Sequence, residues 1–120
     1  MTYARNQALG AYGERIAADH LRGLGMVILA RNWTCHHGEI DIVARDGDTL
    51  VVCEVKTRTS TSHGTALESV SDRKLTQLRR SLSRWLDLHQ VHPDGVRIDV
   101  VTVWVPRSGG PQVERIAGVA

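Results

Sequence analysis

The sequence predicts an α/β fold in which one mixed β-sheet is flanked by helices. Two segments, 6–24 and 72–90, carry apolar residues at helical spacing. Several segments rich in Val, Ile and Leu are typical of strands, and Asp46-Gly47 between two of them is a strong signal for a tight hairpin turn. Because the chain has no phenylalanine and few aromatic residues, its core must be mainly aliphatic, which suits a sheet covered by helices.

The length and charge of the chain limit its organisation and its partners. A chain of 120 residues is long enough for one hydrophobic core, so we expect residues 1–120 to form a single domain. The net charge of +2 allows a local contact with nucleic acid without requiring one. The lack of an apolar signal segment or a long uncharged apolar run predicts a cytoplasmic protein with no membrane contact. Cys35 and Cys53 lack a paired-motif spacing, so we expect free thiols.

The first helix is expected over 6–24 and should be amphipathic. Glu14 lies at the margin of its apolar stripe, where the carboxylate either faces solvent or looks into a cleft at the edge of the core. The short apolar run 26–31 then predicts a buried or edge strand.

The polar segment 32–37 is expected to be a solvated connector, with Trp33 packed over the sheet. Its Cys35, His36 and His37 are potential zinc ligands. Three adjacent residues cannot all point at one tetrahedral ion, however, and no second ligand cluster completes the set. We therefore expect a loop here in preference to a zinc site, with the histidines near a phosphate.

The segments 39–45 and 49–57 predict an antiparallel hairpin, and strand alternation assigns its side chains to faces. One face of the first strand carries Glu39 and Asp41, and the other carries Ile40, Ile42 and Ala44. One face of the second strand carries Leu50, Val52, Glu54, Lys56 and Arg58, and the other carries Val51, Cys53 and Val55. Charge gathers at one end of otherwise apolar strands, which is costly unless the charges are paired, solvated or bound to a ligand.

The polar segment 59–64 predicts a mobile loop beside that charged end, and residues 65–70 are candidates for a short turn. Ser71 is a suitable N-cap for the helix over 72–90. Opposite the apolar stripe of this helix lies a basic face, which is either merely solvated or in contact with phosphate. It consists of Arg73, Gln77, Arg80 and Arg84, with Lys74 at the edge of the stripe.

An alternating, β-branched run predicts a strand over 96–105, in which Arg97 and Asp99 share a face and can pair with each other. A weak last strand is expected over 112–116. Because a helix intervenes, the strands 49–57 and 96–105 are expected to be parallel. The predicted order is α-β-β-β-α-β, with an extra edge strand at the end.

Asp41 on one hairpin strand and Glu54 and Lys56 on the other bring two carboxylates and an ammonium within reach of one point, if the register joins these ends. Magnesium prefers oxygen ligands and keeps several waters, so one or two carboxylates, a backbone carbonyl and a substrate phosphate suffice to hold it. Such an ion neutralises charge on a phosphate and acidifies a water that Lys56 can orient. The set fits phosphodiester hydrolysis. The alternative is that these groups form weak surface ion pairs.

These three residues resemble the Asp, spacer, Glu-x-Lys signature of the PD-(D/E)xK nuclease superfamily. A fuller set of blocks covers nearly the whole chain and is similar to the YraN-type family of uncharacterised bacterial proteins. The blocks are Gly13-Glu14, Arg31-Asn32, Gly38-Glu39-Ile40-Asp41, Glu54-Val55-Lys56-Thr57-Arg58 and Arg97-Ile98-Asp99-Val100-Val101. In one departure, Ile40 stands where the superfamily has a proline before the first acid.

The resemblance implies a restriction-endonuclease-like core of the kind found in Holliday-junction resolvases. It implies that Asp41, Glu54 and the Val55 carbonyl bind Mg²⁺ or Mn²⁺, that Lys56 is catalytic, and that Glu14 completes the metal site. Glu39 is a further candidate ligand from the same block as Asp41. The expected function is a DNA endonuclease of repair or recombination, with branched, flapped or single-stranded substrates favoured. Cutting both strands of a junction would need a homodimer.

A second hypothesis is a non-catalytic nucleic-acid-binding or adaptor protein that keeps the nuclease fold. Its phosphate contacts would come from Arg58, Arg73, Arg80 and Arg84, with Lys74 as a further candidate. A protein that only binds has no reason to retain every acid together with the lysine, so the sequence favours catalysis.

Overall fold

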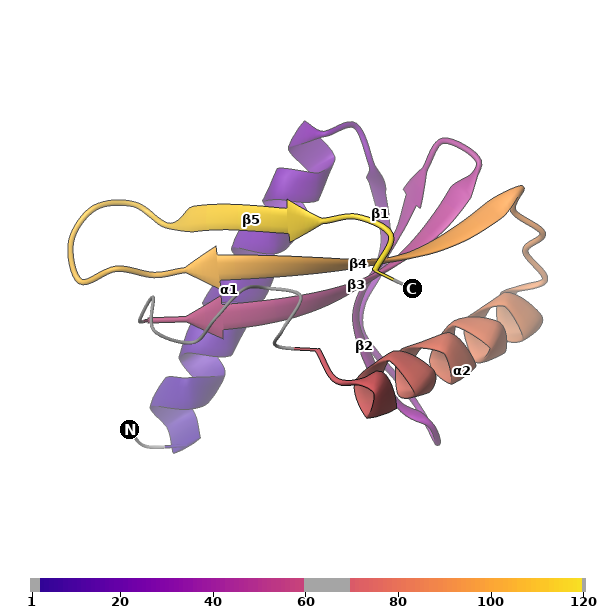
Figure 1. Cartoon of the computed structure of the whole chain (residues 1–120), viewed down its shortest axis with the longest axis horizontal. Helices are drawn as coiled ribbons and strands as arrows, with labels where there is room; N and C mark the ends of the chain where they lie inside the picture. The colour runs from indigo at the N-terminus through magenta and orange to yellow at the C-terminus, as the bar shows by residue number, and fades with distance from the viewer. Residues whose placement is uncertain (1–2, 60–69, 120) are drawn as a thin grey trace.

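The computed structural model describes residues 3–59 and 70–119 and contains a five-stranded mixed sheet with two helices (Figure 1). The elements are α1 (Tyr3–Gly23), β1 (Val27–Cys35), β2 (Gly38–Asp46), β3 (Thr49–Arg58), α2 (Asp72–His89), β4 (Gly95–Trp104) and β5 (Gln112–Ile116). The predicted fold class and element order are confirmed. The expected loop 59–64 and turn 65–70 fall almost wholly on residues 60–69, outside the described part.

The strands lie side by side in the order β1-β2-β3-β4-β5. Neighbouring strands are antiparallel except β3 and β4, which pair in parallel from Thr49↔Gly95 to Arg58↔Trp104. The predicted hairpin and the predicted parallel pair are therefore both confirmed. The parallel pair follows from α2, which carries the chain back to the starting end of β3.

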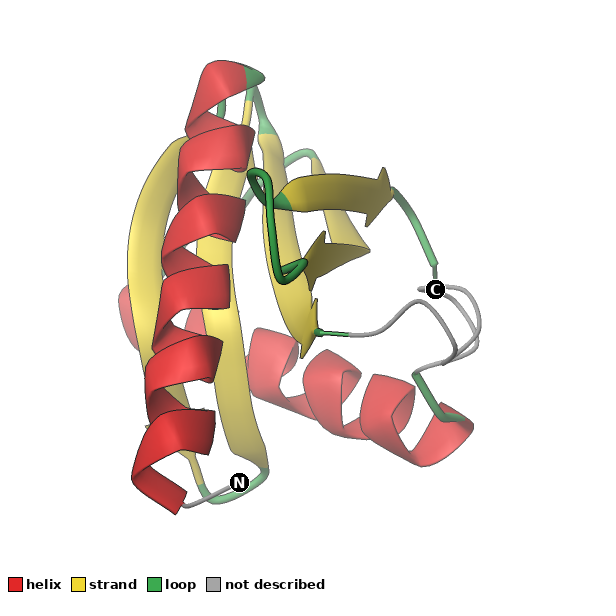
Figure 2. Cartoon of the chain, turned by 90° about the vertical axis from the view of Figure 1, so that its left-hand side faces the viewer, coloured by secondary structure: helices red, strands yellow, loops and turns green. Residues whose placement is uncertain are grey.

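Each helix covers one face of the sheet (Figure 2). The α1 face buries an apolar cluster that includes Ala17, Leu21 and Val51, and the α2 face buries another that includes Leu78 and Trp85. Ser71 caps α2 as predicted, because its side chain accepts a hydrogen bond from the backbone N–H of Lys74. Neither helix of the described part is long and apolar enough to cross a membrane.

The segment 32–37 is mostly strand, so the prediction of a loop there was wrong. β1 continues to Cys35, which pairs with Gly38, and only a two-residue turn at His36 and His37 separates the strands. The prediction took the polar residues of this segment as a sign of a loop. An edge strand that is exposed on one side, however, needs few apolar residues. Trp33 does pack over the sheet as expected, edge-on to Trp85 with ring centroids 5.4 Å apart.

Ile40 does not share a face with Ile42 and Ala44, contrary to simple alternation. Ile40 packs in the α2 cluster, whereas Ile42 and Ala44 pack in the α1 cluster. The pairs Arg31↔Ile42 and Trp33↔Ile40 place Asn32 opposite Asp41, and Asn32 adopts a left-handed φ of 53°. A left-handed residue interrupts the pleat, so both strands change face at this point.

At Gly13, α1 closely approaches the sheet. A side-chain carbon added at Gly13 would lie 2.8 Å from Cγ2 and 2.9 Å from Cβ of Thr57 on β3, and would overlap its hydroxyl. Because Thr57 is short and fixed to a strand, the helix itself would have to move. The glycine therefore lets the next residue, Glu14, lie at the edge of the sheet.

Asp99 is a fully buried carboxylate on β4 whose hydrogen bonds join three segments. It accepts from Arg97 Nε at 2.8 Å, from Arg115 at 2.9 Å and from the backbone N–H of Gly118 at 3.0 Å. The expected pairing of Arg97 with Asp99 is thus confirmed. Because its charge is matched by two guanidinium groups, Asp99 ties β5 and the following residues to β4.

The close approach at Gly13 can be tested by comparing two glycines on one helix. Gly13→Ala should lower the free energy of unfolding by about 1–3 kcal/mol, because overpacking outweighs the better helix propensity of alanine. Gly10→Ala is the matched control, since a methyl group there meets open space. It should raise that free energy by up to about 1 kcal/mol. Denaturant titration measures both, and equal effects would contradict the close approach.

Removing the charge of Asp99 should be strongly destabilising. Asp99→Asn should cost about 3 kcal/mol of the free energy of unfolding, because it leaves Arg97 and Arg115 without their shared carboxylate. Asp94→Asn, at an exposed turn position, should change stability by less than about 0.5 kcal/mol. A similarly small loss for Asp99→Asn in denaturant titration would mean that the network contributes little.

Candidate functional site

The candidate site lies where β2 and β3 separate. Their ladder runs from Asp46↔Thr49 to Ile42↔Cys53 and stops there, and in Figure 1 the start of β2 runs away from β3 toward α2. Beyond the ladder, Asp41 Oδ2 accepts a hydrogen bond of 2.8 Å from the backbone N–H of Val55. Since the N–H and C=O groups of one residue point to the same edge of a strand, the Val55 carbonyl also faces this gap.

Glu54 is the buried acid of the site, with 3 % of the residue exposed. It follows Leu50 and Val52 on the face toward α2, as alternation predicts. Its Oε2 lies 3.3 Å from Lys74 Nζ and 3.8 Å from Lys56 Nζ. These contacts are ion pairs, and within residues 3–59 and 70–119 this buried oxygen has no hydrogen-bond partner.

Burial raises the pKa of Glu54 from 4.5 to about 7. The adjacent Asp41 carboxyl adds to this rise, because two carboxylates so close together cannot both ionise at little cost. Lys74 and Lys56 act in the opposite direction and lower the pKa. The site therefore holds a carboxylate pair that is short of positive charge.

Glu14 and Glu39 reach the same region from the α1 side. Glu14 is 8 % exposed, and its Oε1 accepts a hydrogen bond of 3.3 Å from Arg31 Nε on β1. Burial and the charge of Asp41 raise the pKa of Glu14, and Arg31 opposes that rise. Glu39 is exposed, and its backbone carbonyl accepts a hydrogen bond from Gln77 on α2.

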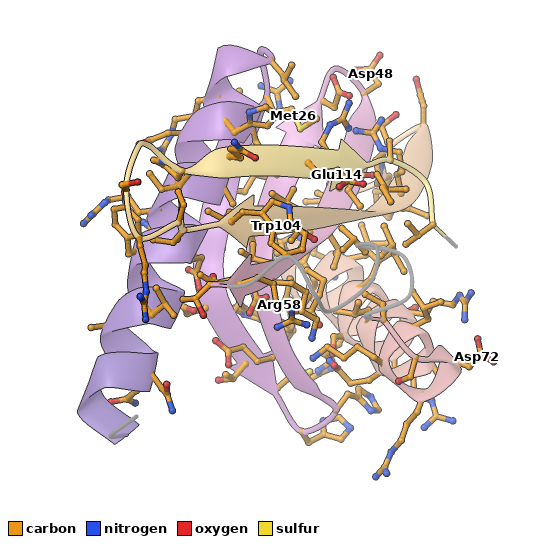
Figure 3. The ribbon with its side chains drawn as sticks, turned by 60° about the vertical axis from the view of Figure 1, so that its left-hand side comes forward. Met26, Asp48, Arg58, Asp72, Trp104 and Glu114 are labelled. Atoms are coloured by element: carbon orange, nitrogen blue, oxygen red, sulfur yellow. The ribbon has the colours of Figure 1, made fainter. Side chains whose placement is uncertain are left out.

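These groups line an open cleft of about 650 Å³ between α1 and the ends of β2 and β3. Its charged lining residues are Glu14, Glu39, Asp41, Lys56 and Arg58. Figure 3 shows Arg58 at the end of β3. Glu54 does not line the cleft but lies deeper, toward α2. Of the two adjacent carboxylates, Asp41 is therefore the one that the cleft exposes.

The donor set suits a hard cation that keeps water ligands. Among the described residues, no group of three or more His, Cys, Asp or Glu side chains could by itself hold a metal ion. Asp41 and Glu54 nevertheless offer two carboxylates beside a backbone carbonyl, and magnesium needs no more from a protein. The buried, unpartnered Oε2 of Glu54 is the oxygen that such an ion would satisfy. Glu14 and Glu39 are then neighbours of the pair, and Glu14 is held by Arg31.

The predicted phosphate-contacting residues do not form one patch. Arg58 lies in the cleft, whereas Arg73 and Arg80 border a separate hollow of about 490 Å³ on α2, beside His37. Arg84 forms an ion pair with Asp87 on the same helix, with 3.9 Å between Nη1 and Oδ2. Lys74 points to Glu54 and so belongs to the carboxylate site.

Sequence reasoning assigned no role to Arg31 and placed Gln77 only in the basic face of the second helix, although Arg31 contacts Glu14 and Gln77 contacts Glu39. Arg31-Asn32 was visible as a sequence block, but only the packing of α1 against β1 brings Arg31 to Glu14. Gln77 looked like part of a solvated face. Its amide in fact bridges the Glu39 carbonyl and the Ser81 hydroxyl.

Comparison with known proteins places the chain in a family. Residues 13–103 match the model of the uncharacterised protein family UPF0102, a span that includes α1 from Gly13 and β1 to β4 up to Val103. A UPF0102 protein of Kineococcus radiotolerans is 57 % identical over 114 residues, which cover 94 % of this chain and 93 % of the relative. One from Nocardioides is 54 % identical, covering 97 % of this chain and 94 % of the relative. One from Streptomyces coelicolor is 52 % identical, covering 94 % and 88 %.

The family model and the individual relatives agree on the family, since the model matches most of the chain and the relatives align over nearly their full length. The membership in an uncharacterised bacterial family that the five blocks predicted is thereby confirmed. Placement in the nuclease superfamily stays a prediction. The chain belongs to the uncharacterised protein family UPF0102.

Proposed function

We propose that this protein is a divalent-metal-dependent endonuclease that hydrolyses phosphodiester bonds of nucleic acid, with DNA as the expected substrate. One observation carries the proposal. The carboxylates of Asp41 and Glu54 adjoin at the point where β2 and β3 part, with the Val55 backbone and Lys56 beside them. A purely structural ion pair does not require two acids to be placed next to each other at a buried position.

Asp41, Glu54 and the Val55 carbonyl are the residues that would hold Mg²⁺ or Mn²⁺. A bound ion of this kind supplies charge neutralisation for a phosphate and lowers the pKa of a water that it binds. The protein fixes one ligand in advance, because Asp41 Oδ2 is already anchored on the Val55 N–H. Asp41 also lines the cleft.

Lys56 is the group that would act on the reacting phosphate. Its side chain lies between Glu54 and the cleft and is 27 % exposed, so its ammonium can reach substrate without leaving the site. There it would orient the attacking water or stabilise the negative charge that builds on the phosphate. Glu14, held by Arg31 on the other wall of the cleft, bounds the same space.

Arg58 is placed to guide a phosphate backbone into the cleft, since it lies at the end of β3 beyond Lys56. Arg73 and Arg80 offer a second contact on α2, and neither forms an ion pair with the described part of the chain. Phosphate contacts of this kind position a nucleic acid without reading its sequence. Affinity should therefore fall as salt concentration rises.

Cleavage is tested on a panel of branched, flapped and single-stranded DNA with Mg²⁺ or Mn²⁺. Wild type should cut at least one substrate, and Asp41→Asn and Lys56→Ala should each reduce the rate by about 100-fold or more. Asp48→Asn, at the exposed hairpin turn, is the matched control and should cut at the wild-type rate.

Metal binding supplies the second arm of that test. Calorimetry should detect Mg²⁺ or Mn²⁺ binding to wild type that Asp41→Asn abolishes. Equal inertness of wild type and variants across the panel, together with no such metal binding, would rule out the nuclease. Salt-sensitive DNA binding without turnover or metal binding would instead support the non-catalytic nucleic-acid-binding protein.

The raised pKa of Glu54 predicts how stability depends on pH. The folded-state pKa of about 7 exceeds the ordinary 4.5, so folding favours the protonated acid. This contribution is fully present below about pH 4.5 and is lost as pH rises through about 7, a loss of up to about 3 kcal/mol. In metal-free buffer, the free energy of unfolding should therefore fall between pH 5 and pH 8, on the order of that amount.

Glu54→Gln removes the titrating group and should flatten this decline, leaving the smaller part due to Glu14. It should also be more stable than wild type at about pH 8 without metal. Glu114→Gln, at an exposed position on β5, is the control and should follow the wild-type profile. Denaturant titration across the pH range measures all three. A wild-type slope retained in Glu54→Gln would show that other groups cause it.

A further inference from the structure

Lys74 is a second lysine at the carboxylate site, and it comes from a different element than Lys56. It lies in the first turn of α2, where its backbone N–H donates to the Ser71 side chain at 3.1 Å. From there its ammonium reaches back to β3 and stops 3.3 Å from Glu54 Oε2. Lys56 Nζ is farther from the same oxygen, at 3.8 Å.

Holding α2 in place does not require this ion pair. The helix is capped by Ser71, and it buries Leu78, Leu82 and Trp85 against the sheet. Such apolar contacts are worth more than one ion pair that is partly open to water. The ion pair is therefore better explained by the charge compensation that Lys74 provides for Glu54 than by any contribution to holding α2 in place.

Glu54 and Asp41 need positive charge in the absence of metal. Glu54 Oε2 is buried and has no hydrogen-bond partner in the described part of the chain, and the neighbouring acid repels its charge. Lys74 supplies the nearest cation. Its side chain is 33 % exposed, so the ammonium can also withdraw into water without disturbing the helix that carries it.

We propose that Lys74 is the counter-ion that stands in for metal at Glu54, and that a divalent cation and the Lys74 ammonium compete for this carboxylate. The proposal rests on the proposed metal-binding function. Once displaced, the ammonium lies on the turn of α2 that also bears Arg73, where it is free to contact a substrate phosphate. Lys74 is thus a positioning residue, which holds Glu54 in place until metal arrives.

If the Lys74 ammonium competes with metal, replacing Lys74 by a neutral residue should strengthen metal binding. Lys74→Met keeps the length of the side chain and removes its charge, so it should tighten Mg²⁺ and Mn²⁺ binding by about three- to tenfold. The same variant should melt at a lower temperature than wild type in chelator and recover in saturating metal. With Ca²⁺ in place of Mg²⁺, its affinity for a single-stranded oligonucleotide should fall about threefold.

Calorimetry with the metal alone measures the decisive quantity. Lys74→Gln is a second neutral variant and should also tighten metal binding, whereas Lys74→Arg keeps the charge and should stay within about twofold of wild type. Arg79→Met removes an exposed cation from the same helix, at a position outside the proposed site, and should leave metal affinity unchanged.

A merely structural ion pair would lower the melting temperature and leave metal affinity unchanged or weaker in both neutral variants, and this result would overturn the proposal. Wild-type metal binding that Asp41→Asn abolishes but Lys74→Met does not tighten would overturn the role of Lys74 alone. If wild type binds no metal, the role of Lys74 is wrong, and the nuclease function is wrong as well if no DNA of the panel is cut.

Discussion

The hydrogen bond from the Val55 backbone N–H to the Asp41 carboxylate is the contact on which the site depends. When β2 leaves β3 after Ile42↔Cys53, the next N–H on that edge loses its ladder partner. A backbone donor left unsatisfied in a partly buried position is costly, and Asp41 meets that need with its side chain. The same bond fixes the first acid of the site on the strand that carries the second.

The charges around this bond show how the fold tolerates a buried acid. Glu54 lies among aliphatic residues on a strand that is covered on both faces, so its charge is opposed by burial and by Asp41. Lys56 from the same strand and Lys74 from α2 offset part of that cost. Elsewhere in the sheet Asp99 is buried as completely, but two arginines and a backbone N–H satisfy it fully. Unlike Asp99, Glu54 has an oxygen that the described residues leave without a hydrogen bond, as expected of a group that binds a ligand.

Local sequence patterns were sufficient to predict those structural features that depend on a single physical rule. The Asp46-Gly47 turn, the Ser71 cap and the face assignment of β3 were all predicted, because each depends on neighbours in the chain. The prediction failed over 32–37 and at Ile40. A left-handed residue at Asn32 reverses the alternation of two paired strands, and neither strand alone carries a signal for it.

The sequence by itself determined the order of the elements, the hairpin, the parallel β3–β4 pair and the membership of Asp41, Glu54 and Lys56 in one charged region. These follow from periodicity, turn chemistry and residue type, which are local properties. Only the tertiary structure decided where the β2–β3 ladder ends, that Arg31 holds Glu14, and that Lys74 lies at Glu54. Those contacts join residues at least seventeen positions apart, or depend on how one strand leaves another, so the packing of whole elements sets them.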